Sequence, residues 1–87
     1  MFSKTVTLVN PQGFHMRPAS LFVAEVGKFS APVKIIAKGN EIPGNSLMAI
    51  MAAGIKCGDE IEIQADGADE QAAVDAIVAF VEGGMGD

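Results

Sequence analysis

Polar and apolar residues alternate along four short stretches of the chain. A period of two is typical of β-strands that bury one face. These stretches are residues 2–9, 33–37, a short piece around 41–42, and 60–65. In the last stretch Ile61, Ile63 and Ala65 share the apolar parity. The segment Lys-Gly-Asn-Glu at 38–41 predicts a hairpin turn between the second and third strands, with Gly39-Asn40 supplying the positive φ angles.

Three other stretches have the period of a helix. From Pro18 onward the apolar residues recur at the spacing i, i+3, i+4 and i+7, and we expect this helix to end at residues 27–28, with Phe29 folding back onto the core. Residues 46–53 form a short helix that is apolar nearly all round, and a third helix follows Asp69 as N-cap and ends at Gly83-Gly84. The apolar positions of the first and third helices are Ala19, Phe22, Val23 and Val26, and Val74, Ile77, Val78 and Val81.

The predicted order of elements is β-α-β-β-α-β-α. Every strand keeps one polar face, which favours an antiparallel sheet covered on one side only. Three amphipathic helices then cover the other side, so the fold class is α+β, a two-layer sandwich. With 87 residues we expect a single domain over 1–87, and we expect residues 85–87 at the tail to fray.

Composition and charge exclude several classes of function. The net charge is −5 without a run of Lys or Arg, so nucleic acid and anionic membranes are poor partners. No phosphate-binding glycine loop, metal-ligand spacing or catalytic triad occurs, which argues against cofactors, metals and a self-sufficient enzyme. The single Cys57, interpreted as a small turn residue, fits a reducing compartment. Since no signal peptide or membrane-spanning run is visible, we expect a cytoplasmic protein.

The only histidine is the strongest candidate for chemistry. Pro18 is tolerated in the first turn of a helix, so the first helix begins within a residue or two of it and His15 stands at or before the N-cap. The free amides of a first turn bind anions, and Arg17 adds a guanidinium that can hold two phosphoryl oxygens. This pattern indicates a phosphorylated imidazole. From the spacing alone, an ordinary polar surface histidine remains the commoner interpretation.

The segment Gly-Phe-His-Met-Arg-Pro-Ala-Ser at 13–20 resembles the active-site signature of the HPr family, the phosphocarriers of the bacterial sugar phosphotransferase system. Residues 45–63 and 66–77 resemble the family's second signature and its last helix. The resemblance implies an open-faced β-sandwich with strand order 1-4-2-3, without cofactors. It implies that His15 is phosphorylated at Nδ1 by Enzyme I and passes the phosphoryl group to IIA domains. Arg17 is then the phosphate-binding neighbour, and Ser46 is the serine modified by HPr kinase/phosphorylase.

The sequence departs from the family pattern near both signatures. Phe14 and Met16 replace smaller or more usual residues, from which we expect a bulkier loop beside the imidazole, and Gln12 is a longer amide than in some members. Asn45 stands where many members carry Lys, so a cation is missing next to Ser46. Recognition of Ser46 by a kinase is therefore an open question.

An apolar patch is expected beside Ser46. Successive helical residues are separated by 100°, so the apolar side chains of this short helix cannot all face the sheet. Ile50, with Ala53 on the same side, is the inward candidate. We therefore expect Leu47, Met48 and Met51 to be turned toward solvent and to contact partners, together with Ser20. The chain is expected to be a monomer.

Ser46 has a simpler role that is compatible with regulation, because serine before a helix is a common N-cap. Two alternative functions also stay open. One is a nitrogen-type HPr paralogue in a regulatory phosphorelay. The other is a binding module that works through Ser46 and the methionines as a corepressor of a catabolite-control regulator.

Overall fold

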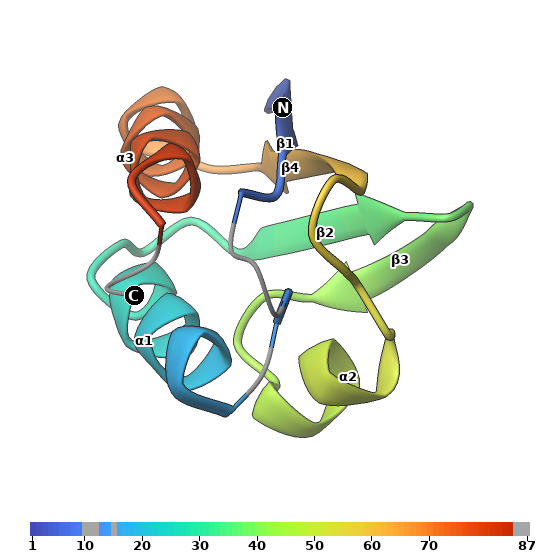
Figure 1. The fold of residues 1–87 in the computed structure, drawn as a ribbon. Coiled ribbons are helices and arrows are strands. Elements are labelled where there is room, and N and C mark those ends of the chain that lie inside the picture. The colour runs from blue at the N-terminus through green and yellow to red at the C-terminus, as the bar shows by residue number, and fades with distance from the viewer. Residues whose placement is uncertain (10–12, 15, 85–87) are drawn as a thin grey trace.

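The computed structural model describes residues 1–9, 13–14 and 16–84, and its elements follow the predicted order. They are β1 (Phe2–Thr7), α1 (Met16–Val26), β2 (Val33–Ala37), β3 (Asn40–Pro43), α2 (Leu47–Ala52), β4 (Glu60–Ala65) and α3 (Glu70–Glu82). Figure 1 shows the helices packed to one side of the sheet. The predicted α+β class is confirmed.

The four strands form one antiparallel sheet with the order β1-β4-β2-β3. This is the strand order that the family resemblance implies. The central strand β4 pairs with β1 over its full length, from Phe2 opposite Ala65 to Thr7 opposite Glu60. Helix α3 packs against β1 and β4, while α2 lies against β3 and α1 contacts both other helices. The result is an open-faced sandwich of one sheet and one helical layer.

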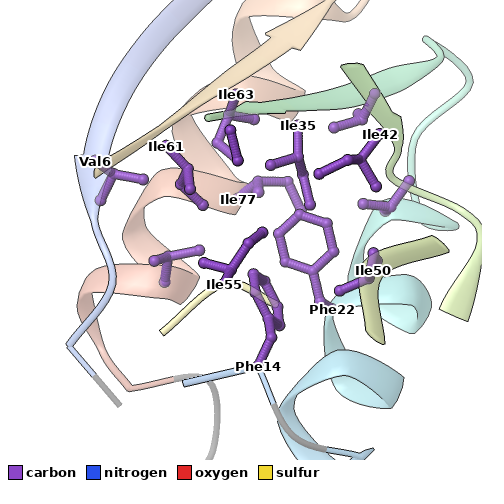
Figure 2. Packing of buried hydrophobic residues seen from close by; sticks show 14 of the residues in the cluster. Val6, Phe14, Phe22, Ile35, Ile42, Ile50, Ile55, Ile61, Ile63 and Ile77 are labelled. Carbon is purple, nitrogen blue, oxygen red and sulfur yellow. The ribbon is translucent and has the colours of Figure 1, made fainter. Parts of the chain in front are cut away.

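The core lies between the sheet and the helices. The alternate residues of the strands that point to the helices are buried, as Ile35, Ile61 and Ile63 show with at most 1 % exposure. Figure 2 shows Ile77 of α3, Phe22 of α1 and Ile50 of α2 meeting these side chains. A single apolar cluster therefore fixes the positions of all three helices.

The other face of the sheet is polar. Ser3, Thr5 and Thr7 of β1 are exposed, and Glu62 and Gln64 of β4 are half-buried. Residues of this parity stand opposite one another in the registry, which leaves a hydrophilic surface without a covering layer.

The hairpin turn between β2 and β3 differs from the prediction by one residue. Ala37 pairs with Asn40, so the turn consists of Lys38 and Gly39. Both have a positive φ, at 54° and 79° respectively. A two-residue turn of this type needs the left-handed conformation at both central positions. The prediction that Asn40 belongs to the turn is therefore wrong. Lys38 adopts the left-handed conformation instead.

Asp69 is the N-cap residue of α3, as predicted, but its side chain has a different role. Its side chain makes no bond to the helix amides. Instead the carboxylate accepts hydrogen bonds from the amides of Ser30 at 2.9 Å and Ala31 at 2.8 Å. These bonds, led by that from Ser30, lower the pKa of Asp69. Asp69 therefore ties the α1–β2 loop to the start of α3.

The remaining boundaries agree closely with the sequence patterns. Helix α1 begins at Met16, two residues before Pro18, and ends at Val26 before Gly27. Strand β1 ends at Thr7, but the amide of Leu8 still donates to the carbonyl of Asp59 at 2.9 Å. Residues 85–87, expected to fray, lie outside the described residues.

Candidate functional site

The segment before α1 is held against the loop that joins α2 to β4. Gly13 has a φ of +68°, and a Cβ at this position would stand 2.5 Å from the carbonyl oxygen of Ile55 and 2.8 Å from Cα of Lys56. The next amide, of Phe14, donates to that same carbonyl at 3.1 Å. Only glycine fits both the conformation and the close approach. This contact fixes where the chain enters α1.

Phe14 points into the core and does not enlarge the loop surface. Its side chain is 6 % exposed, and its ring meets that of Phe22 edge-to-face, with centroids 5.4 Å apart. Figure 2 shows Phe14 reaching up beside Ile55 and Phe22. The expected bulk beside the imidazole is therefore wrong for Phe14. Its ring anchors the loop from below, since aromatic burial is a large stabilising contribution.

Helix α1 presents its N-terminus at the end of this anchored segment. Met16 is the first helical residue and is 62 % exposed. The amides of the first turn lack partners within a helix, and the helix dipole adds partial positive charge there. His15 itself lies outside the described residues. In the sequence it directly precedes Met16.

Arg17 lies on the first turn of α1 and is exposed. Within residues 1–9, 13–14 and 16–84 its guanidinium forms no ion pair with a carboxylate. Pro18, next in the chain, is buried and packs the turn onto the core. As far as the described residues show, Arg17 is thus a cation without a carboxylate partner on the turn that follows His15.

Ser46 is the N-cap of α2. Its backbone is extended, with φ −114° and ψ 105°, and its Oγ accepts a hydrogen bond from the amide of Ala49 at 3.3 Å. Its own amide donates to the carbonyl of Pro43 at 3.3 Å. The predicted capping role is therefore confirmed. Asn45, just before it, is exposed.

The apolar side chains of α2 follow the prediction for Met48 and Ile50 and follow it in part for Leu47 and Met51. Met48 is 79 % exposed and Ile50 is fully buried, as expected. Leu47 and Met51, expected to be turned toward solvent, are only half-buried and pack against the edge of the core. Met48 alone projects fully into water.

Helix α1 lies next to α2 and carries several exposed residues. The two helices contact each other, as their neighbouring positions in Figure 1 show. Ser20 is exposed on α1, and so are Met16 and Leu21, which is 38 % exposed. The exposure of Leu21 was not anticipated, although its position outside the apolar stripe of α1 was a usable signal. We call Met16, Arg17, Ser20, Leu21 and Met48 the α1–α2 surface.

The α2–β4 loop carries charged groups close to the same region. Asp59 accepts a hydrogen bond from the amide of Lys56 at 2.9 Å and forms an ion pair with Lys38 at 3.5 Å. The bond from Lys56, followed by the charge of Lys38, lowers the pKa of Asp59. Cys57 is exposed in this loop, with its Sγ 3.9 Å from the carbonyl of Val9. Its interpretation as a turn residue is confirmed.

The described residues were also compared with the requirements of a ligand pocket, a metal site and a membrane-spanning helix. A hollow of about 450 Å³ lies at the opposite end of α1 and is lined by residues of the α1–β2 loop, β2 and the β3–α2 turn. Across the described part of the chain, no three His, Cys, Asp or Glu side chains gather to hold a metal ion. Among these residues no helix has the length and apolarity needed to cross a membrane. The candidate site is the exposed N-terminus of α1.

Comparison with known proteins identifies the family. The model described as "PTS HPr component phosphorylation site" matches residues 2–83, nearly the whole chain. This chain belongs to the HPr family. The HPr phosphocarrier of Mycoplasma capricolum is 49 % identical over 78 residues, covering 87 % of this chain and 83 % of the relative. HPr proteins are carriers of the phosphotransferase system and not enzymes.

Solved HPr structures share the fold. HPr from Thermoanaerobacter tengcongensis superposes with a TM-score of 0.94 at 33 % identity, covering 100 % of this chain and 98 % of that one. A dimer of HPr from the same organism matches with a TM-score of 0.78 over the full length of both chains. The HPr-like protein Crh of Halalkalibacterium halodurans is 35 % identical over 82 residues, covering 94 % of this chain and 98 % of that relative. The family thus includes both HPr and Crh proteins of similar length.

Proposed function

We propose that this chain carries a phosphoryl group on His15 between Enzyme I and the IIA domains of sugar permeases. The observation that carries the proposal is the exposed N-terminus of α1, which begins at the residue after His15 and bears Arg17, a cation with no ion-pair partner among the described residues. Amides and a guanidinium at that position stabilise the oxygens of a phosphoryl group. The anchoring of Gly13 and Phe14 gives the loop a defined entry into the helix.

The transfer itself needs a neutral ring. The lone pair of the unprotonated Nδ1 attacks phosphorus, the bond from phosphorus to the donor breaks, and the reverse step discharges the group to the next acceptor. The helix N-terminus and Arg17 both disfavour the imidazolium, so we expect the pKa of His15 to lie below its ordinary value. The carrier contributes the nucleophile and electrostatic stabilisation, and its partners contribute the rest of each active site.

The α1–α2 surface is the proposed docking site for these partners. Met48 is the most exposed large apolar side chain on it, and methionine adapts its shape to several partners. Leu47 and Met51 flank it at the edge of the core. Ser46 caps α2 two residues before Met48, so a phosphate on its Oγ would add negative charge at the start of this helix. Regulation by a kinase at Ser46 is therefore part of the proposal.

Acceptance and discharge can be measured in two steps. The purified chain is incubated with bacterial Enzyme I and radiolabelled phosphoenolpyruvate, and a IIA domain is then added. We expect acid-labile, base-stable label on the chain that moves to the IIA domain. Label that never reaches IIA would contradict the carrier role. The monomeric state and the cytoplasmic location remain predictions, and gel filtration tests the first against the dimer known for an HPr relative.

A second candidate function is that of a Crh-like regulator. The similarity to Crh of Halalkalibacterium halodurans supports this candidate, and the capping Ser46 is available for modification. The presence of His15 favours the phosphocarrier, because loss of the histidine is what a purely regulatory module would tolerate. A nitrogen-type relay uses the same chemistry and is distinguished by which IIA domain accepts the label.

A further inference from the structure

Helix α2 carries one methionine that projects into water and one that packs on the core. Met48 is 79 % exposed, whereas Met51 is half-buried and lies against the apolar cluster. The two side chains stand three positions apart in a helix, Leu47–Ala52, that contains no charged residue. The helix therefore offers a matched pair of thioethers, one open to solvent and one shielded by its neighbours.

Two other methionines of the described residues are exposed. Met16 is the first residue of α1, is 62 % exposed and belongs to the α1–α2 surface. Met1 is 74 % exposed and precedes β1, outside that surface. Exposure makes all three thioethers accessible to a dissolved oxidant, so their position on the molecule decides which of these reactions affects docking.

An accessible thioether is oxidised by a peroxide. The sulfur lone pair attacks one peroxide oxygen, the O–O bond breaks, and the sulfur becomes a sulfoxide while water is released. The sulfur loses two electrons and the peroxide gains them. A methionine sulfoxide reductase reverses the change, because two thiol groups then supply the electrons and form a disulfide and water.

We propose that Met48 is an oxidation-sensitive contact of the α1–α2 surface, at which a peroxide reversibly weakens the docking of partners. The inference rests on the proposed function, in which partners cover this side chain. In the free chain the sulfoxide oxygen of Met48 stays hydrated. In a complex the same oxygen loses its water, and a partner site that accepts an apolar thioether is not arranged to donate a hydrogen bond to it.

Oxidation of Met51 would have a different consequence. Its side chain packs against the edge of the core, so a polar sulfoxide there would disturb packing and lower Tm. Its smaller exposure also slows its reaction with a dissolved peroxide. A limited treatment therefore modifies Met48 while Met51 is still intact, and docking is weakened in a chain that stays folded.

The test treats the chain with hydrogen peroxide. Three quantities are measured: the extent of oxidation at each methionine by peptide mass spectrometry, the Tm, and the KM of Enzyme I for the chain before and after treatment. Every chain compared carries Cys57→Ser, because peroxide also oxidises an exposed thiol. Met48→Leu removes the proposed site, while Met16→Leu and Met51→Leu are control variants that keep it.

We expect Met48 to be oxidised at least about 5-fold faster than Met51. Oxidation at Met48 should change Tm by less than about 3 °C, as a surface substitution does. It should raise the KM about 10-fold with little change in kcat, and treatment with a methionine sulfoxide reductase and a thiol reductant should restore the KM. The rise should persist in Met16→Leu and Met51→Leu and be absent from Met48→Leu.

A rise in KM of the same size in Met48→Leu would overturn the proposal. A fall in Tm that follows oxidation at Met48 would also overturn it, because weaker docking would then result from lost structure. The order of oxidation and the Tm need no partner protein. If Enzyme I does not phosphorylate the untreated chain, the proposed function fails and this inference with it. If the untreated chain is phosphorylated and oxidation at Met48 leaves the KM unchanged, only the role of Met48 fails.

Discussion

Replacing Gly13 with alanine tests how the loop before α1 is anchored. The substitution adds a Cβ 2.5 Å from the carbonyl oxygen of Ile55 and 2.8 Å from Cα of Lys56, and both neighbours are backbone atoms. Neither can yield as a flexible side chain would. We expect the loop to move away, which breaks the hydrogen bond from Phe14 to Ile55.

Gly54 provides a matched control. It has the same φ of +68°, but nothing lies within 4 Å of where its Cβ would be. Alanine in the left-handed conformation costs about 1 kcal/mol at either position. At Gly13 the lost hydrogen bond adds about 1 kcal/mol, and the crowded backbone adds about 1 kcal/mol or more. We therefore expect a total loss of about 3 kcal/mol for Gly13→Ala.

Thermal unfolding measures the difference. For a domain of this size 1 kcal/mol corresponds to about 5 °C in Tm, so we expect losses of about 5 °C for Gly54→Ala and about 15 °C for Gly13→Ala. At a temperature where both variants are folded, only Gly13→Ala should slow phosphorylation by Enzyme I. Equal losses of Tm would refute the close contact between Gly13 and the α2–β4 loop.

Three further predictions concern the site and its frame. Arg17→Ala should slow transfer from Enzyme I about 10- to 100-fold, since one charge-assisted contact is lost, with Tm nearly unchanged; unaltered kinetics would remove Arg17 from the site. Met48→Ala should raise the KM for the carrier while changing stability by less than about 0.5 kcal/mol, whereas Ile50→Ala should cost about 2–5 kcal/mol; a stability loss at Met48 without a kinetic effect would place it in the core. The pKa of Asp69 is lowered by folding, so its contribution is complete above its unfolded value of about 3.9 and is lost as pH falls through its folded pKa. The Tm difference between the unaltered chain and Asp69→Asn should thus shrink below about pH 4, and a difference independent of pH would contradict this role.

Much of the fold could be predicted because periodicity reports which face of an element is buried. The alternation at 60–65 and the helical spacing at 74–81 placed β4 and α3 with their buried residues. The hairpin was predicted one residue too late, because both Gly39-Asn40 and Lys38-Gly39 contain the glycine that such a turn needs. Which pair forms the turn depends on the register of β2 and β3.

The misplaced side chains depend on contacts between distant segments. Phe14 lies between two elements and belongs to no periodic run, so nothing local showed that it packs on Phe22. Asp69 has a typical capping position, yet its carboxylate binds the amides of Ser30 and Ala31, 38 or more residues away in the chain. Similarly, the nearness of Gly13 to Lys56 exists only in three dimensions. Sequence patterns within one element do not contain this information.

The central claim is that His15 alone carries the phosphoryl group. The most direct measurement incubates the unaltered chain and His15→Ala, each purified and shown to unfold at the same temperature, with Enzyme I and labelled phosphoenolpyruvate. We expect one acid-labile phosphoryl group on the unaltered chain, located at Nδ1 of His15 by NMR, and none on His15→Ala. Retained acid-labile label on His15→Ala would contradict the account.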